Sequence, residues 1–191
     1  MALNDQELIL HARGGDMSAF EQLVYRYDKH VFAIAAKFCD SSDDAKDIYQ
    51  EVFLRVYNGL KKFEARSEFS TWLYRITTNV CLTHHERRKR RPRAHAADDP
   101  DGQSGDPLSD LSSPDPSPEQ RTVDADIGAR IHKALGTLSP QQKLVFTLRH
   151  YQGYKLKEIA TMMKCTEGTV KRYLFAATQR MRGQLHDVFE R

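Results

Sequence analysis

The feature that most limits how this chain can fold is a proline-rich stretch near its middle. Six of the seven prolines lie between residues 92 and 124, among five serines and an excess of acidic residues. A segment with so few large apolar side chains cannot bury enough surface to offset the entropy lost on ordering. We therefore expect a flexible acidic linker over residues 92–124 between two folded blocks, residues 1–91 and 125–191.

Both blocks carry apolar residues at steps of three and four, which predicts amphipathic helices, and neither contains a convincing alternating strand. Start signals agree with this spacing: Ser41 and Ser139-Pro140 are typical helix N-terminal sequences. The expected fold is all-α, with two small helical bundles joined by the linker. The predicted helices span about 20–38, 41–60, 69–88, 127–138, 139–152, 155–163 and 167–185.

The charge of the chain is divided unevenly. Residues 1–90 carry a net +1, residues 91–126 a net −6 and residues 127–191 a net +8. A basic C-terminal block suggests a polyanionic partner. No apolar run approaches the ~20 residues of a membrane span, and the N-terminus lacks the pattern of a signal peptide. We expect a cytoplasmic protein without membrane insertion.

Metal, cofactor and catalytic sites are not expected from the motifs. The three cysteines are scattered and form no CxxC pair, which argues against a disulfide framework and a four-ligand zinc site. Cys81, His84 and His85 stand at helical spacing, but no further ligands lie nearby in the sequence. P-loop, GxSxG and HExxH motifs do not occur, so we expect no cofactor, no bound metal and no enzyme.

The strongest local pattern is a helix-turn-helix in residues 156–182, LKEIATMMKCTEGTVKRYLFAATQRMR. Ala160 is small where two helices must cross, and Thr166 suits the cap of the second helix. Lys164 occupies the turn position where glycine is usual, so a lysine must adopt a less favourable conformation there. The alternative is an ordinary helical hairpin with a solvated basic face. Outward positions suited to phosphate and base contacts are Thr169, Lys171, Arg172, Tyr173 and Phe175.

Two further surfaces in the first block could bind partners. Asp43, Asp47 and Glu51 recur every four residues and form an acidic stripe, which is either a solvated face or a docking surface for a basic protein. Residues 61–91 interleave aromatic and basic side chains, as single-strand binders do, although some of the aromatics must be core.

Five motifs in order resemble an extracytoplasmic-function (ECF) sigma factor of bacterial RNA polymerase, within the sigma-70 family. They are GGDMSAFEQLVYRY, DDAKDIYQEVFLRVY, FSTWLYRITTN, LSPQQKLVFTLRHYQG and EIATMMKCTEGTVKRYL, and they cover nearly all of the chain outside the linker. The resemblance implies that the first block binds the promoter −10 element and the second block the −35 element. It implies, as partners, core RNA polymerase through its beta-prime clamp and beta flap, promoter DNA, and an anti-sigma factor.

The resemblance also gives roles to individual residues. The helix that docks on the polymerase clamp corresponds to Asp47, Gln50, Glu51 and Phe53. The pocket and surface for the melted −10 strand correspond to Phe63, Glu64, Arg66, Trp72, Arg75, Asn79, Arg87, Arg88 and Arg90. The −35 reading helix corresponds to Thr169, Lys171, Arg172, Tyr173 and Phe175.

Two stretches depart from the family's common pattern. FEARS stands where FRGDS-like strings are common, and KRYLFAATQR stands where KSRLHRARER is common. These departures bear on which promoter sequence is read. The competing interpretation is a stand-alone helix-turn-helix regulator, which would use residues 127–191 and leave the acidic stripe and the Trp72, Arg75 and Asn79 face without a role.

Overall fold

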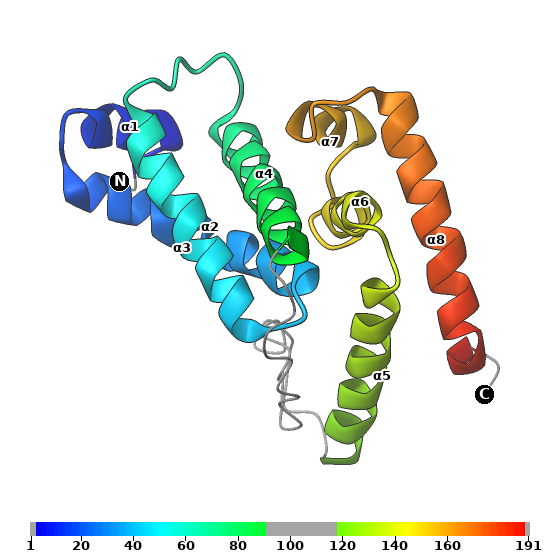
Figure 1. The fold of residues 1–191 in the computed structure, drawn as a ribbon. Coiled ribbons are helices and arrows are strands. Elements are labelled where there is room, and N and C mark those ends of the chain that lie inside the picture. The colour runs from blue at the N-terminus through cyan, green and yellow to red at the C-terminus, as the bar shows by residue number, and fades with distance from the viewer. Residues whose placement is uncertain (1–2, 91–117, 190–191) are drawn as a thin grey trace.

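The computed structural model describes residues 3–90 and 118–189, with side chains described over 3–90 and 127–186. Every regular element within these ranges is an α-helix, which confirms the all-α prediction (Figure 1). None of these helices is long and apolar enough to span a membrane. Most of the predicted flexible linker, residues 92–117, lies outside the described residues.

The helices of the first block are α1 (Asp5–Arg13), α2 (Met17–Phe38), α3 (Ser42–Leu60) and α4 (Phe69–Arg90). Those of the second block are α5 (Pro118–Gly136), α6 (Pro140–His150), α7 (Leu156–Met162) and α8 (Glu167–Phe189). Helix α5 begins inside the segment that we predicted as linker, so residues 118–124 are helical. Proline suits the first position of a helix, where its missing N–H would have no intrahelical partner anyway.

Side-chain caps fix several helix starts where the sequence predicted them. Ser41 Oγ accepts from the Asp43 amide at 3.2 Å. Ser139 Oγ accepts from the Gln142 amide at 3.3 Å, and the Gln142 side chain accepts from the Ser139 amide at 3.1 Å. This reciprocal pair is a capping box, which satisfies two amides that have no intrahelical partner.

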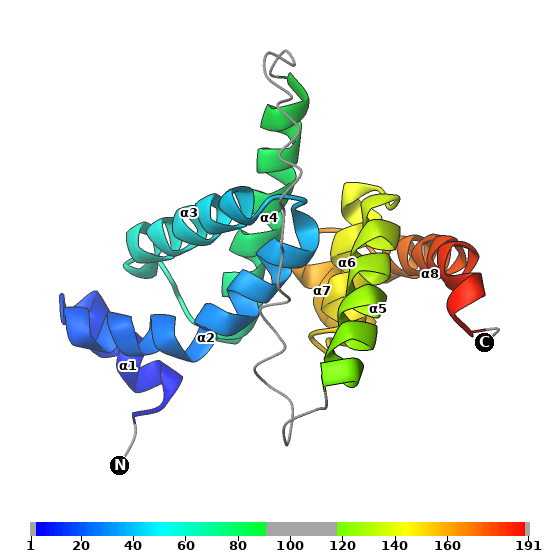
Figure 2. The same ribbon diagram turned by 90° about the horizontal axis from the view of Figure 1, so that it is seen from below.

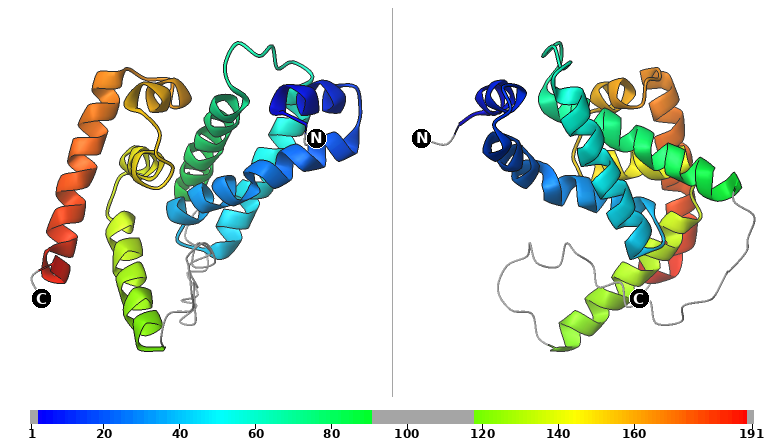
Figure 3. Two further views of the ribbon diagram at one scale, coloured as in Figure 1. Left: turned by 180° about the vertical axis from the view of Figure 1, so that it is seen from behind. Right: turned by 60° about the vertical axis from the view of Figure 1, so that its left-hand side comes forward.

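Helix α4 lies between α3 on one side and α6 and α7 on the other, as two views show (Figure 1, Figure 2). Helix α8 packs against α5, α6 and α7 and lies on the outer side, away from α1–α3 (Figure 3). The +8 block therefore turns its long helix α8 away from the acidic helix α3 of the first block. The three cysteines are free thiols: Cys39 and Cys81 are buried and Cys165 is half-buried.

The two blocks pack against each other through a shared core, although we expected them to fold independently. One continuous cluster of buried apolar residues includes Leu73 of α4, Leu148 of α6 and Met162 of α7. The sequence predicted one apolar side for α4, but the structure buries a second side that carries Tyr74 and Thr78. This second side explains how one helix can serve two bundles.

Candidate polymerase-docking and nucleic-acid interfaces

The acidic stripe of α3 borders an open groove between α3 and α4. Asp47 and Gln50 are exposed, and half-buried Glu51 accepts from Arg55 Nε at 2.7 Å. The groove has a volume of about 910 Å³, and Leu54 lines it beside these three polar residues. Basic side chains, Arg87 and Arg88 among them, line the α4 side of the same groove. On the α3 side, an apolar side chain beside two carboxylates fits a partner with both basic and apolar groups.

Phe53 does not belong to this surface. Its side chain is 9% exposed and its ring packs edge-on against Tyr49, with 4.9 Å between the ring centroids. The next residue, Leu54, is 57% exposed. The sequence contained a signal for Leu54, because residues 47, 50, 51 and 54 share one helical face, whereas Phe53 shares its face with Tyr49 and Val56.

Phe63 is also a core residue. Its ring lies 4.9 Å from the Trp72 ring and 5.9 Å from the Phe69 ring, between centroids, and only 6% of the residue is exposed. Gly59 makes room for this cluster, because a Cβ there would lie 3.1 Å from Trp72 Cζ2. The ring of Phe63 is therefore unavailable to stack on a base in this conformation.

The loop after Phe63 presents polar groups instead. Glu64 and Arg66 are exposed and form an ion pair at 2.6 Å, on either side of Ala65. Ala65 has φ of +52°, a left-handed conformation that is costly for a residue with a Cβ. The FEARS sequence thus folds into a strained loop whose two opposite charges offset each other.

Half-buried Trp72, Arg75 and Asn79 are spaced along one side of α4. Their spacing of three and four residues brings an aromatic ring, a cation and an amide into line along the helix. An amide can read a base edge and a guanidinium can hold a phosphate, so this face can follow a single strand. The structure brings these three predicted residues together.

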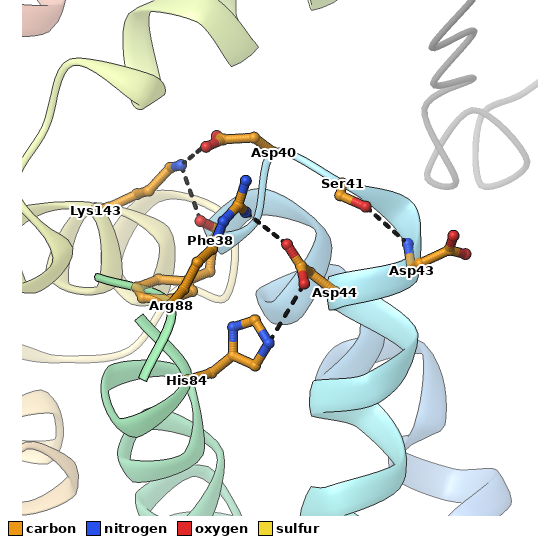
Figure 4. A network of polar contacts seen from close by, with 8 residues as sticks. All are labelled: Phe38, Asp40, Ser41, Asp43, Asp44, His84, Arg88 and Lys143. Atoms are coloured by element: carbon orange, nitrogen blue, oxygen red, sulfur yellow. Dashed lines mark hydrogen bonds and ion pairs between the residues drawn. The ribbon is translucent and has the colours of Figure 1, made fainter. Parts of the chain in front are cut away.

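The basic end of α4 takes part in a polar network at the surface (Figure 4). Arg87, Arg88 and Arg90 are all exposed. Arg88 Nη1 also donates to Asp44 Oδ2 at 2.6 Å, and Asp44 Oδ1 lies 3.4 Å from His84 Nε2. Arg88, which we predicted to bind DNA, here ties the end of α4 to the first turn of α3.

No group of three or more His, Cys, Asp or Glu side chains within the described ranges is placed to hold a metal ion. Cys81 is fully buried, and burial raises the pKa of its thiol well above the usual value. His84 faces Asp44, and the His85 ring packs against Phe38.

The helix-turn-helix is present in α7 and α8. Ala160 is buried at the crossing, and Thr166 Oγ1 accepts from the Thr169 amide at 3.2 Å, which caps α8. Lys164 in the turn has φ of +51°, as its place in the turn predicted. The Cys165 amide then donates to the Ala160 carbonyl at 3.0 Å, which closes the turn.

The predicted −35 residues occupy two kinds of position on α8. Lys171, Arg172 and Phe175 are exposed. Thr169 is half-buried, and Tyr173 is half-buried and packs against the core. The Arg172 guanidinium lies 5.9 Å from the centroid of the Tyr173 ring, a cation–π contact that restricts the arginine.

A second, apolar groove of about 450 Å³ lies between α6 and α8 and includes Phe146, Met181 and Leu185. Two of the basic side chains at this groove are His150 and Arg182. Burial, and to a smaller extent the charge of Arg149, lowers the pKa of His150. We did not predict this groove from the sequence.

Two family models match the chain. Sigma-70 region 2 matches residues 23–91, and Sigma-70, region 4 matches residues 128–181. The RNA polymerase sigma-H factor of Pseudomonas aeruginosa is 34% identical over 178 residues, which are 92% of this chain and 90% of that protein. The ECF RNA polymerase sigma-E factor of Escherichia coli K12 is 30% identical over 192 residues, which are 99% of this chain and 98% of that protein.

Solved structures agree on the fold. CnrH in complex with the cytosolic domain of CnrY has a TM-score of 0.68 at 22% identity, covering 96% of this chain and 97% of that one. The sigma factor RpoE in complex with the anti-sigma factor NepR from Bartonella quintana has a TM-score of 0.64 at 20% identity, covering 87% and 96%.

These matches define the class of protein: a sigma factor that carries regions 2 and 4. The chain belongs to the ECF sigma factors of the sigma-70 family. It is therefore an alternative sigma factor, a transcription initiation factor that binds core RNA polymerase and promoter DNA.

Proposed function

We propose that residues 1–91 act as a region 2 domain that docks on the beta-prime clamp through α3. The docking residues are Asp47, Gln50 and Glu51, with Leu54 as the apolar contact at their centre. The exposure of Leu54 beside carboxylates supports this assignment, because hot spots combine an apolar anchor with surrounding polar groups. Phe53 supports the helix from the core instead.

The face of α4 reads the melted −10 strand in this proposal. Asn79 and the loop side chains Glu64 and Arg66 meet an unpaired base, while Trp72 and Arg75 support and hold the strand. Unpairing a base costs a few kcal/mol, which these contacts must recover. Phe63 is the buried wall beneath the loop, and Arg87, Arg90 and, after release from Asp44, Arg88 hold phosphates.

Residues 125–191 act as the region 4 domain that reads the −35 duplex. The exposed side chains Lys171 and Arg172 enter the major groove with Thr169 at the start of the helix. Phe175, which is 67% exposed, offers an apolar contact for a thymine methyl group. Tyr173 acts through Arg172 by limiting the directions in which the guanidinium can point.

The remaining partners follow from the same proposal. The apolar groove between α6 and α8 receives a segment of the beta flap. An anti-sigma factor is a further partner, since both similar solved structures named above are of complexes and RpoE is bound to one. Because polymerase and DNA are cytoplasmic, the chain acts there, as an initiation factor without chemistry of its own.

One observation carries this function: a single chain combines an acidic surface on α3 with two separate faces, on α4 and on α8, that carry basic and hydrogen-bonding side chains. A stand-alone helix-turn-helix regulator would need only the last of these. The experiment is co-elution of the chain with core RNA polymerase on a sizing column. Wild type should co-elute, and Glu51→Arg should weaken the complex.

The control for that experiment is Glu21→Arg, which reverses an exposed charge on α2. It should bind core polymerase like wild type. If the wild-type chain binds DNA duplexes but never core polymerase, the stand-alone regulator is the correct function.

A further inference from the structure

The two blocks are joined by contacts whose atoms come from both sides. Thr78 Oγ1 shares its proton between the Arg75 carbonyl of its own helix at 3.1 Å and the Met162 carbonyl of the other block at 3.3 Å. The ring centroids of Tyr74 and Tyr154 lie 5.3 Å apart. Burial, and then its contact with Tyr154, raises the pKa of Tyr74. These contacts fix α7 directly against α4.

Lys143 makes the most unusual of these contacts (Figure 4). Its Nζ donates to the Phe38 carbonyl at 2.9 Å and to Asp40 Oδ1 at 3.3 Å. The lysine side chain is only 7% exposed, whereas that of Asp40 is 67% exposed. Phe38 is the last residue of α2, where carbonyls lack intrahelical partners and the helix dipole is negative.

Contacts within the second block do not stabilise the positive charge of Lys143. It lies in the first turn of α6, where the helix dipole disfavours a cation. Lysine is almost never buried unless its ammonium is paired. Only the contact across to the end of α2 explains a buried cation at this place.

The closed arrangement brings the two DNA-reading faces too close together for a promoter. Asn79 follows Thr78, which bonds to Met162, and Met162 precedes the α8 cap Thr166 by four residues. Four residues span at most about 15 Å, so Asn79 and the start of α8 lie within roughly 30 Å. By their names, the −10 and −35 elements are about 25 base pairs apart, or roughly 85 Å of duplex.

We propose that the contact of Lys143 with the end of α2 is an autoinhibitory latch. It holds regions 2 and 4 in a closed state that cannot engage both promoter elements at once, and its release opens the chain. The inhibitory role of the latch rests on the proposed function, but closure itself can be measured without polymerase or DNA.

The test uses Lys143→Glu in the full chain. Glutamate in the first turn suits the dipole of α6, so the block should keep its fold, but it repels Asp40 and the end of α2. Losing charge-assisted hydrogen bonds should shift the closed-to-open ratio by about tenfold or more. The matched control is Gln141→Glu, which adds the same charge to the same helical turn outside the described contact.

Small-angle X-ray scattering and hydrogen exchange report on opening. Lys143→Glu should increase the radius of gyration and speed amide exchange in α7 by about tenfold or more, with unchanged helical circular dichroism. Gln141→Glu should match wild type. The charge swap Lys143→Glu with Asp40→Lys should restore part of the compactness. The latch proposal would be overturned if Lys143→Glu kept the wild-type radius of gyration and the wild-type amide exchange in α7. It would also be overturned if the charge swap restored none of the compactness.

The functional consequence is measured on a genomic fragment that the wild-type holoenzyme transcribes. When core polymerase, that fragment and the chain are mixed at the same time, Lys143→Glu should form heparin-resistant complexes faster than wild type, because it needs no opening step before it engages polymerase. A variant that opens by scattering yet forms complexes at the wild-type rate would overturn the inhibitory role. If the wild-type chain supports no transcription at all, the proposed function fails, while the scattering result still decides whether Lys143 closes the chain.

Discussion

Phe53 and Leu54 are neighbours on α3, but truncating them should have different effects. Leu54→Ala should weaken polymerase binding, and Phe53→Ala should lower the stability of the fold. Leu54 is 57% exposed, and burying a whole leucine side chain is worth about 1.5–3 kcal/mol. Covering its exposed part against polymerase therefore contributes about 0.9–1.7 kcal/mol. Leu54→Ala should weaken binding about 5- to 20-fold with little change in the free energy of unfolding.

Phe53→Ala should do the opposite, because the ring it removes is 9% exposed. Emptying that space should cost about 3–5 kcal/mol of stability, with only a small effect on the affinity of the molecules that remain folded. Fluorescence anisotropy with core polymerase measures affinity, and urea unfolding measures stability. Tight binding by Leu54→Ala together with weak binding by a stable Phe53→Ala would refute the assigned helical face.

Three further predictions follow from particular residues. Arg172→Ala should weaken binding to a −35 duplex by about 1–3 kcal/mol in a mobility shift, whereas Asn79→Ala should spare that binding and reduce permanganate reactivity of −10 thymines. Equal damage to both readouts by Asn79→Ala would contradict the division of labour. Lys164→Gly should raise the free energy of unfolding by about 0.5 kcal/mol, and the urea midpoint with it, because glycine adopts a φ of +51° without strain; a lower midpoint would count against this. Burial raises the pKa of the Cys39 thiol from 9.0 to about 12 and raises that of Cys81. Unfolded thiols therefore ionise first, and stability should be constant below pH 9 and fall as the pH rises from about 9 towards 12. The loss should be about 1 kcal/mol per thiol at pH 10, and a flat profile between pH 8 and 10 would show that the thiols do not matter.

The helices and their caps were predictable because the determining interactions are local. Ser139, Pro140 and Gln142 form the N-terminal cap of α6 and lie within four residues of sequence. Lys164 lies in the strained turn before α8. The short helix α1 was not predicted, although Asn4 and Glu7 form a capping box at its start. Its nine residues make only about two and a half turns, which is too short a stretch for a helical repeat to stand out in the sequence.

The resemblance assigned roles to elements of the fold but did not tell which side chains point outwards. Phe53 and Phe63 share motifs with exposed residues, yet helical phase and the aromatic cluster put both in the core. Contacts between the blocks were not predictable, because a single lysine such as Lys143 resembles any surface cation in the sequence. Its burial depends on the end of a helix about a hundred residues earlier in the chain.

Transcription from genomic DNA fragments, with core RNA polymerase and this chain as the only added factor, tests the central claim most directly. The chain should give discrete transcripts that core polymerase alone does not make, with start sites downstream of a shared pair of −35 and −10 sequences. Asn79→Ala should reduce these transcripts, as should Arg172→Ala. Transcripts indistinguishable from those of core polymerase alone would contradict the assignment of this chain as a promoter-directing sigma factor.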